Sequence, residues 1–562
     1  MSKSTIYAPD TTLASDDHKV GELLALSRGN NGAMLDSASA AVVNVVGEAI
    51  KNPADLLPAR MVKLLDKIEA KSQPAAVCAM LDGIKRFEHE HGFTPTADMI
   101  DAAISQGMSL ADGSAPILPG GMTLDSASSS MQSSPLSHQP NRINVALVMG
   151  IAEALPFGAY LSADISSNES LLAIINSAAG TDFGAYKDGD IMDGISSGKS
   201  YINPERIQKV VLSADRTTAT FAFKTTDAGN GQAIPVVPTR TRVIIGGFTV
   251  AAEIDKNAKT ASRQIAGNVN IKGADHGIVG TVKFADGTGA LTFSPALPED
   301  TVVSVSGFVD YEAKPSLIPA IKTEATSWSL YCTEQRVLMQ VTPGSRSQGQ
   351  NELGTDFLTV AVNAARRQMA NERFYTALGK VRAVAENTSK TFDFDAANQL
   401  LQKSRAQRWR DFAAFFGEVS QLVAITTMEY GLSMLFVGTK GASNFRTMGS
   451  DDFQPSGIEE RPGVYRVGRY KGKVDVYYTP YHITETDTEI EMIGIGRAQQ
   501  VARNPIVLSD ALAPTMIPLG VGTDLKAGAA LYTRNMTEVN PHTPSAMGCA
   551  LIRVSNIDLL AV

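Results

Sequence analysis

The sequence predicts an α+β fold, in which helical blocks and strand-rich blocks occupy different stretches of the chain. Apolar residues recur at helical spacing over 37–52, 54–71 and 75–91, and again over 355–386. Short strands of alternating polarity, separated by Gly, Pro, Asp and Asn, fill 206–320 and 463–554. Together these blocks indicate an α+β protein with several parts.

Length and composition set the first limits on function. A chain of 562 residues predicts several domains or one domain with large insertions. With 44% hydrophobic and 19% charged residues, it has ample apolar material for a core. The formal net charge of −8 and the pI of about 5.5 disfavour a dedicated DNA-binding protein. A container that encloses nucleic acid without gripping it fits this charge.

Cysteine usage and hydropathy point to a reducing compartment and away from membranes. The three cysteines are odd in number and far apart, which disfavours a disulfide framework or a zinc site: Cys78, Cys332 and Cys549. The first residues lack an apolar leader, so no signal peptide is expected. The two most apolar stretches are interrupted by Glu153 and Glu429, so no membrane span is expected either.

The first half of the chain divides by composition into four segments. Residues 1–107 are predicted to be a helical region, and 108–142 a linker rich in Ser, Gly and Pro. Residues 143–205 begin with an apolar segment and continue as loops. Residues 206–320 are predicted to be a separate β-subdomain, with tight turns at Asp286-Gly287 and around Gly229.

The second half contains the strongest helix of the chain. Residues 323–345 form one long amphipathic segment, and 355–386 a helix with Thr355 as its N-cap. Its apolar stripe consists of Leu358, Val362, Ala365, Met369, Leu378, Val381 and Ala385. At ~1.5 Å per residue this helix is roughly 45 Å long. A second helical region is expected over 395–432, and strands follow to the C-terminus.

Three short motifs near residue 190 could carry chemistry. Gly194-Ile-Ser-Ser-Gly198 matches a nucleophile elbow, but the flanking residues predict neither strand nor helix, so a loop is favoured over a catalytic Ser196. Gly198-Lys199-Ser200 ends like a phosphate loop, but Asp193 replaces its first glycine. Asp188, Asp190 and Asp193 lack the spacing of a calcium loop, which favours a solvated turn.

Other candidate residues also have a structural interpretation. His89 and His91 lie two apart, so on a helix they cannot bind one metal ion together. Gly494 and Gly496 lack the rest of a dinucleotide fingerprint and are better explained as strand glycines. Three arginines could contact phosphates but are more simply salt-bridge partners: Arg366, Arg367 and Arg373. We therefore predict no catalytic, cofactor-binding or metal-binding residue, and no enzyme.

From about Val145 to Val554 the chain resembles the major capsid proteins of tailed bacteriophages, especially the T-even myovirus type and its large relatives. The resemblance rests on segments that occur in the family's order, and each is modest alone. They are TDFLTVAVNAARRQMANERFY (355–375), FDFDAANQLLQKSRAQRWRDF (392–412), ITTMEYGLSMLF (425–436), GVYRVGRYKGKVDVYYTPY (463–481) with EIEMIGIGR (489–497), ARNPIVLSDALAPTMIPLG (502–520) and AALYTRNMTEVNPHTPSAMGCALIRVSNI (529–557).

The resemblance implies the tailed-phage capsid (Johnson) fold. The N-arm and start of the fold would occupy 143–205, and the extended loop with its inserted β-subdomain 206–320. A peripheral domain with the spine helix 355–386 would occupy 321–424, an axial domain 425–520, and closing strands 521–562. The N-terminal helical unit 1–107 has no counterpart in the family, and either a removable scaffold-like segment or a permanent addition is expected there. Ile151-Ala-Glu153-Ala154 resembles a T-even protease site within an apolar segment.

The function implied is that of a structural subunit that self-assembles into hexamers, with pentamers as a further option. These would form an icosahedral head around double-stranded DNA, assembled in the host bacterial cytoplasm and retained in the virion. Expected partners are further copies of the chain and cement, vertex or portal proteins, without a cofactor or a membrane. The alternatives are an encapsulin-like bacterial nanocompartment shell, and an enzyme or a tail component.

Overall fold

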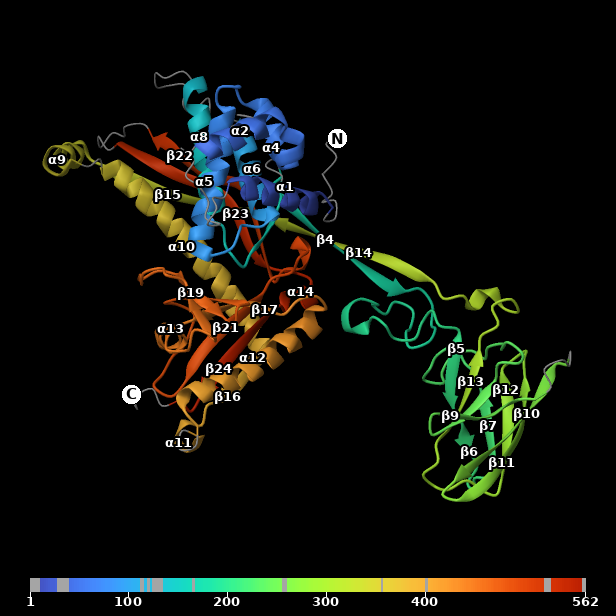
Figure 1. The fold of residues 1–562 in the computed structure, drawn as a ribbon. Coiled ribbons are helices and arrows are strands. Elements are labelled where there is room, and N and C mark those ends of the chain that lie inside the picture. The colour runs from blue at the N-terminus through green and yellow to red at the C-terminus, as the bar shows by residue number, and fades with distance from the viewer. Residues whose placement is uncertain are drawn as a thin grey trace. The chain divides into compact units, whose positions relative to one another are not determined.

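The computed structural model describes residues 11–27, 40–111, 116–118, 122–123, 135–163, 167–254, 260–354, 357–399, 403–519 and 527–557. The chain forms two compact units, residues 1–174 with 327–562 and residues 175–326 (Figure 1). Helices and strands fall in separate blocks, and the predicted α+β class is confirmed. The predicted linker 108–142 is too long at both ends, because residues 108–111 belong to helix α6 (Ala97–Ala111) and residues 135–142 to helix α8 (Pro135–Ala152); residues 112–115, 119–121 and 124–134 of it lie outside the described residues.

The N-terminal part of the first unit is helical. Its helices are α1 (Thr11–Ser27), α2 (Ala40–Lys51), α3 (Pro53–Leu56), α4 (Ala59–Lys67), α5 (Gln73–His91), α6 (Ala97–Ala111) and α8 (Pro135–Ala152), and a short pair of strands, β1 (Pro116–Leu118) and β2 (Met122–Thr123), lies between the last two. Helix α5 ends where Gly92 adopts a φ of 74°, which lets its N–H bond to the carbonyl of Glu88. The apolar faces of α5 and α6 both pack on α8.

A four-stranded sheet forms the centre of the first unit. Its order is β15 (Thr333–Val341), β23 (Ala527–Val539), β22 (Ile506–Leu519) and β3 (Ala159–Leu161). The first three strands are antiparallel, and β3 runs parallel to β22. Helix α10 (Phe357–Ala385) packs on β15 and β23. The polar helix α9 (Pro343–Leu353) precedes it.

Helix α10 agrees with the predicted spine helix 355–386 to within two residues. Its 29 residues make it about 43 Å long. Val362, Met369, Leu378, Val381 and Ala385 of the predicted stripe are buried. Ala365 packs against the cluster that contains Val362 and Met369. The predicted N-cap Thr355 and the side chain of Leu358 lie outside the described residues.

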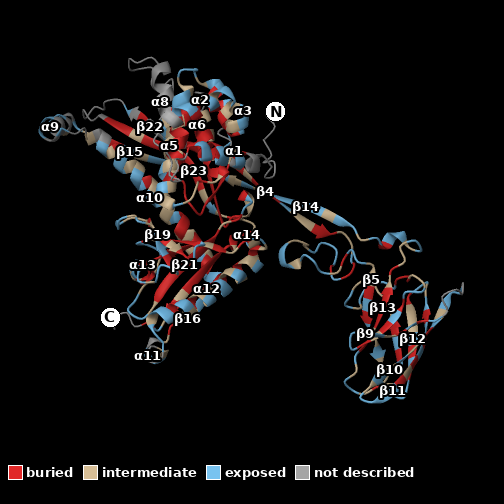
Figure 2. Ribbon diagram, in the orientation of Figure 1, coloured by how far each residue is buried: buried red, intermediate tan, exposed pale blue. Residues whose placement is uncertain are grey.

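A seven-stranded sheet forms the other layer of this unit. Its order is β16 (Ser389–Asp393), β24 (Cys549–Ser555), β21 (Ile490–Gly496), β17 (Leu432–Val437), β20 (Val474–Tyr478), β19 (Tyr465–Tyr470) and β18 (Phe453–Pro455). Strand β21 is buried at every position, which explains why all its residues except Glu491 are apolar (Figure 2). Helices α12 (Arg405–Thr427) and α13 (Thr439–Arg446) pack on this sheet, and α11 (Ala396–Gln399) and α14 (Thr543–Ala546) are single turns.

Helix α12 has a clear start signal in the sequence. Ser404 accepts a hydrogen bond from the backbone of Gln407, and the Gln407 side chain accepts one from the backbone of Ser404, which forms a capping box. The helix ends at Met428, whose φ of 67° is left-handed. Its apolar face buries Trp409, Phe412 and other aromatic side chains in the core of the seven-stranded sheet.

Strand pairing divides the sequence differently from the predicted domains in two places. Strand β22 pairs with β23 and β3, so the predicted domain 425–520 contributes strands to both sheets. The closing segment 521–562 is divided in the same way, because β23 and β24 belong to different sheets. The amphipathic segment 323–345 forms most of β14 (Ile321–Tyr331) and all of β15 rather than one element. Both strands are largely exposed, so their sequences lack the alternation of apolar and polar residues that a half-buried strand shows.

The second unit contains a nine-stranded antiparallel sheet. Its order is β5 (Glu205–Lys209), β13 (Val303–Phe308), β8 (Arg242–Ile245), β9 (Phe248–Glu253), β10 (Ser262–Ile271), β11 (Ala274–Lys283), β12 (Thr288–Ser294), β7 (Thr218–Ala222) and β6 (Val211–Leu212). Only Val210 separates β5 from β6, so the two ends of the sheet meet and the sheet closes. The predicted turn at Asp286-Gly287 connects β11 and β12, with a Gly287 φ of 63°.

The chain passes between the units in two strands. These are β4 (Glu169–Ala179) and β14, which form a two-stranded sheet of their own. The strands of the nine-stranded sheet all fall within the predicted β-subdomain 206–320, except that β5 begins one residue earlier.

Candidate functional site

The nucleophile-elbow motif lacks the local structure that this chemistry needs. Gly194–Ser196 forms a single 3-10 turn, and both flanking residues, Asp193 and Ser197, are extended. The backbone carbonyl of Ser196 accepts a hydrogen bond from the Tyr186 hydroxyl. Because neither a strand precedes this turn nor a helix follows it, nothing strains Ser196 into an exposed nucleophile position.

The phosphate-loop fragment likewise lacks a following helix. Gly198 has a φ of 85°, and Lys199 Nζ lies 6.0 Å from the centroid of the Tyr186 ring. Ser200 Oγ accepts a hydrogen bond of 3.3 Å from Arg206. The residues after Ser200 form a bend that leads into β5, so the fragment cannot present helix N–H groups to a phosphate.

The three aspartates of this region each have a different partner. Asp190 and Asp193 accept hydrogen bonds from the backbone N–H groups of Lys187 and Ser177, at 2.8 and 2.9 Å. Asp188 pairs with Lys322 at 2.9 Å. Within the described part of the chain, no group of three His, Cys, Asp or Glu side chains is arranged to hold a metal ion.

The two histidines of α5 point to different surroundings. His89 is exposed, whereas His91 packs on Phe87, Phe93 and Tyr477. His91 Nδ1 lies 3.3 Å from the Tyr477 hydroxyl. Burial lowers the pKa of His91 to about 4. The two imidazoles therefore lie in different surroundings, one in solvent and one among aromatic rings.

The strand glycines of β21 serve close packing. A Cβ atom on Gly494 would lie 2.8 Å from Leu432 Cδ1, and one on Gly496 would lie 2.5 Å from the carbonyl oxygen of Gly431. Both glycines therefore let neighbouring chain segments approach β21 closely. No helix follows them directly, so the dinucleotide interpretation has no structural support.

The arginines of α10 differ in their roles. Arg373 is a salt-bridge partner, as predicted, but its partner is Asp510 on β22, at 2.8 Å. Its guanidinium also lies 5.7 Å from the Tyr160 ring centroid. Arg366 acts electrostatically on Glu153, and Arg367 is exposed. The burial of the Arg373–Asp510 pair removes Arg373 from any phosphate-binding surface.

A second buried charge cluster joins the N-terminal helices. Asp101 on α6 pairs with Arg60 on α4 at 3.1 Å, and Asp16 on α1 accepts a hydrogen bond from the backbone of Ala59. Burial raises the pKa of Asp101 to about 6, although Arg60 opposes this rise. The cluster therefore joins helices α1, α4 and α6.

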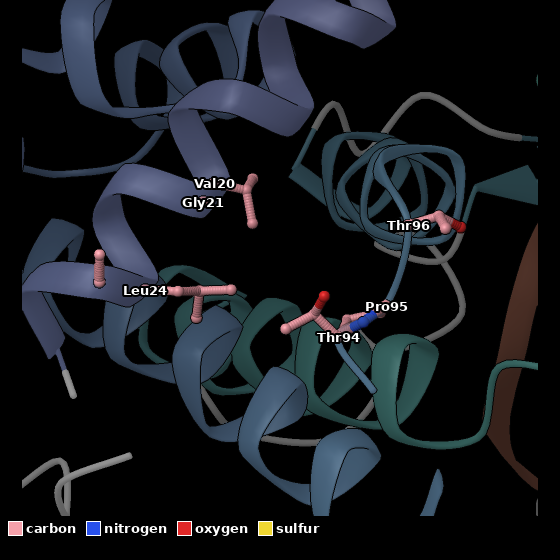
Figure 3. A pocket seen from close by; sticks show the side chains of 7 residues that line it. Val20, Gly21, Leu24, Thr94, Pro95 and Thr96 are labelled. Atoms are coloured by element: carbon pink, nitrogen blue, oxygen red, sulfur yellow. The ribbon is translucent and has the colours of Figure 1, made fainter. Parts of the chain in front are cut away.

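A shallow pocket of about 440 Å³ lies between α1 and the loop before α6 (Figure 3). Its lining consists of Val20, Gly21, Leu24, Ala25 and Thr94–Thr96. None of these side chains ionises or acts as a strong nucleophile. The pocket therefore offers no constellation for catalysis.

The clearest candidate for binding is a surface rather than a pocket. Strand β15 is the outer strand of its sheet, so one row of its backbone N–H and C=O groups lacks a strand partner within this sheet. Leu338 on this strand is 61% exposed, and Tyr331 just before it is 62% exposed. Val360 on α10 is 52% exposed. We call Thr333–Val341 the β15 edge; an exposed edge with apolar side chains is suited to pairing with another chain.

The sequence did not predict this surface, because an exposed apolar residue cannot be told from a core residue by its sequence pattern.

The three cysteines are free thiols. Cys78 is half-buried, and Cys332 and Cys549 are buried. None of the described helices is long and apolar enough to cross a membrane.

No protein-family model and no curated protein matches the chain. Solved structures of phages and of an encapsulin are similar to parts of it. A chain of the icosahedrally averaged capsid of the jumbo bacteriophage PhiKZ is 10% identical, with a TM-score of 0.38, over 72% of this chain and 93% of that one. For Mycobacterium phage Che8 the identity is 12% and the TM-score 0.28, over 52% and 85%. A chain of the holo-SrpI encapsulin complex from Synechococcus elongatus is 9% identical, with a TM-score of 0.27, over 42% of this chain and 79% of that one.

Proposed function

We propose that this chain is the structural major capsid protein of a tailed bacteriophage, and that it is not an enzyme. Copies of the chain assemble into hexamers, and pentamers where the shell closes, to form an icosahedral head around double-stranded DNA. Assembly takes place in the host bacterial cytoplasm, and the chain stays in the virion. Cement, vertex or portal proteins bind the same shell.

The observation that carries the proposal is the packing of α10. Its first half, with Val362 and Met369, packs on Met339 and Leu531 of the four-stranded sheet. Its second half, with Val381, shares a core with strands of the seven-stranded sheet. One long helix thus connects two sheets, which supports the spine, peripheral and axial parts that the sequence resemblance implies.

Two further features support a role in assembly. The second unit, residues 175–326, contains the segment 206–320, where the resemblance implies the extended loop with its inserted β-subdomain. The β15 edge supplies an exposed outer strand, which lies shortly before the spine helix α10 in the sequence. A ring needs only modest contacts of this kind, because interfaces repeated through a closed shell act together.

The acidic net charge is compatible with an inner wall that does not hold DNA tightly. Neutralising phosphates with Lys and Arg releases counterions and produces strong, salt-dependent binding. A chain with a formal net charge of −8 gives little of this effect overall. Packaged DNA could then move along the wall during filling and release.

The test is to express the full chain, alone and with its genomic neighbours, and to image the purified protein by electron microscopy. We expect closed particles or flat sheets built from six-fold rings. Particles that enclose cargo proteins instead of nucleic acid would favour the nanocompartment shell. A protein that stays monomeric in all conditions, at all concentrations and with all neighbours would contradict the proposal.

A further inference from the structure

The N-terminal helices do not form a core of their own. Their buried apolar residues belong to one continuous cluster that also includes residues of α10 and of both sheets. Phe157, in the loop after α8, illustrates this continuity. Its ring lies 5.4 Å from the rings of Phe374 on α10 and Phe436 on β17, measured between centroids. The helical layer is therefore packed into the first unit and not appended to it.

Asp98, at the start of α6, is the polar junction of this layer. Its side chain is 3% exposed and pairs with Arg497, 13% exposed, at 3.1 Å. Arg497 directly follows β21, the most buried strand of the seven-stranded sheet. Asp98 Oδ2, which Arg497 also contacts, accepts a hydrogen bond of 3.0 Å from the backbone N–H of Tyr160, which is on β3 of the four-stranded sheet. One carboxylate thus binds both sheets.

Arg497 extends the same junction to the loop before β3. Its guanidinium donates to the carbonyl oxygens of Pro156 and Gly158, at 2.8 and 3.1 Å, and to Thr96 Oγ1 at 2.6 Å. Charge-assisted bonds of this kind, buried and shared among several acceptors, hold a fixed geometry. Arg497 lies 399 residues from Asp98 in sequence, so the contact depends entirely on the tertiary fold.

Helices α5 and α6 each make one further contact, α5 with the loop before β19 and α6 with β22. At the end of α5, Glu90 pairs with Arg461 at 3.3 Å, near the start of β19 in the seven-stranded sheet. On α6, Gln106 donates a hydrogen bond of 3.0 Å to Asp510, on β22 of the four-stranded sheet. The layer therefore contacts residues of both sheets or of their connecting loops at points other than the Asp98 junction.

We propose that α5, α6 and the connecting residues 92–96 form a brace that fixes the two sheets of the first unit relative to each other, with Asp98 as its locking residue. Without the Asp98 carboxylate, Arg497 is a buried cation with fewer partners, and the N–H of Tyr160 has lost its acceptor. The two sheets then remain connected by α10 and the apolar core, and they can shift against each other. This inference is independent of the proposed function, because it concerns motion within one chain.

The test compares Asp98→Ala with a matched control, Asp475→Ala, in the full chain. Asp475 is also a buried aspartate bound by arginines, Arg466 at 2.8 Å and Arg469 at 3.1 Å, but all three lie on β19 and β20 of one sheet. Amide hydrogen exchange is measured over both sheets. Spin labels at Gln340→Cys on β15 and Lys390→Cys on β16, in a Cys78→Ala background, report the distance between the sheets.

For Asp98→Ala we expect amide exchange in both β3 and β21 to quicken, on the order of tenfold or more, and the distance distribution to broaden. For Asp475→Ala we expect faster exchange in β19 and β20 only, with β3 and the distance distribution unchanged. If Asp98→Ala does not fold, Thr96→Val is measured instead, because it removes the two hydrogen bonds that Thr96 Oγ1 makes in the same junction, one accepted from Arg497 and one donated to Asp98. The proposal is overturned if the Asp98 or Thr96 variant leaves the distribution as narrow as in the wild type, or if the Asp475 variant broadens it equally.

Discussion

Replacing Met369 by aspartate is the sharpest test of the spine helix. The Met369 side chain is 8% exposed and packs with Val362, Met339, Ala529 and Leu531. Removing a buried methionine side chain costs about 2–5 kcal/mol. Burying a carboxylate adds several kcal/mol, because a pKa raised by about 3 units corresponds to roughly 4 kcal/mol. The sum, at least about 6 kcal/mol, is comparable to the ~5–15 kcal/mol that stabilises a typical protein.

The assay is the soluble yield and the thermal unfolding temperature of Met369→Asp, followed by its assembly state. The matched control is Asn371→Asp, which adds the same charge at an exposed position of α10 and is expected to change stability by no more than about 0.5 kcal/mol. Met369→Leu preserves volume and is expected to cost less than about 1.5 kcal/mol. If Met369→Asp unfolds at the same temperature as Asn371→Asp, the assignment of the buried stripe is refuted.

Three further predictions concern buried ionisable side chains. Because the pKa of Asp101 is raised to about 6, the folded chain binds the Asp101 proton more tightly than the unfolded chain does. The free energy of unfolding should therefore fall as pH rises from about 4 to 6. Asp101→Asn should flatten this dependence in denaturant titrations. The lowered pKa of His91, about 4, has the opposite sign, so stability should be lost as pH falls from about 6.5 to 4, and His91→Phe should remove that loss from the same titrations. Arg373→Met leaves the buried Asp510 without its cation and should cost about 3–5 kcal/mol, and the double variant with Asp510→Leu should recover part of it; additive losses in unfolding experiments would contradict the pairing.

Much of the fold could be predicted because its signals are local. The stripe of α10 repeats with the helical period, and the helix occupies nearly the predicted residues. Strands β19 to β21 alternate with turn residues at the expected places. The chemical motifs could be set aside for the same reason, because the strand–turn–helix context that Ser196 would need is itself a local property.

What could not be predicted depends on contacts between distant residues. The sequence identifies Arg373 as a salt-bridge partner, but only the fold brings Asp510 to it. The helical region 1–107 reads as a separate unit, because its periodicity does not reveal that Asp98 meets Arg497 and Tyr160. The exposed Leu338 of β15 cannot be told from a core leucine until the strand order places it at an edge.

The most direct test of the proposed function is electron cryo-microscopy of particles assembled from the full-length chain. We predict closed icosahedral shells whose six-fold rings are made of this chain, each copy containing the α10 helix and the two sheets described above. Particles of another symmetry, filaments, or a dispersed monomer under every assembly condition would contradict the role of this chain as a capsid subunit.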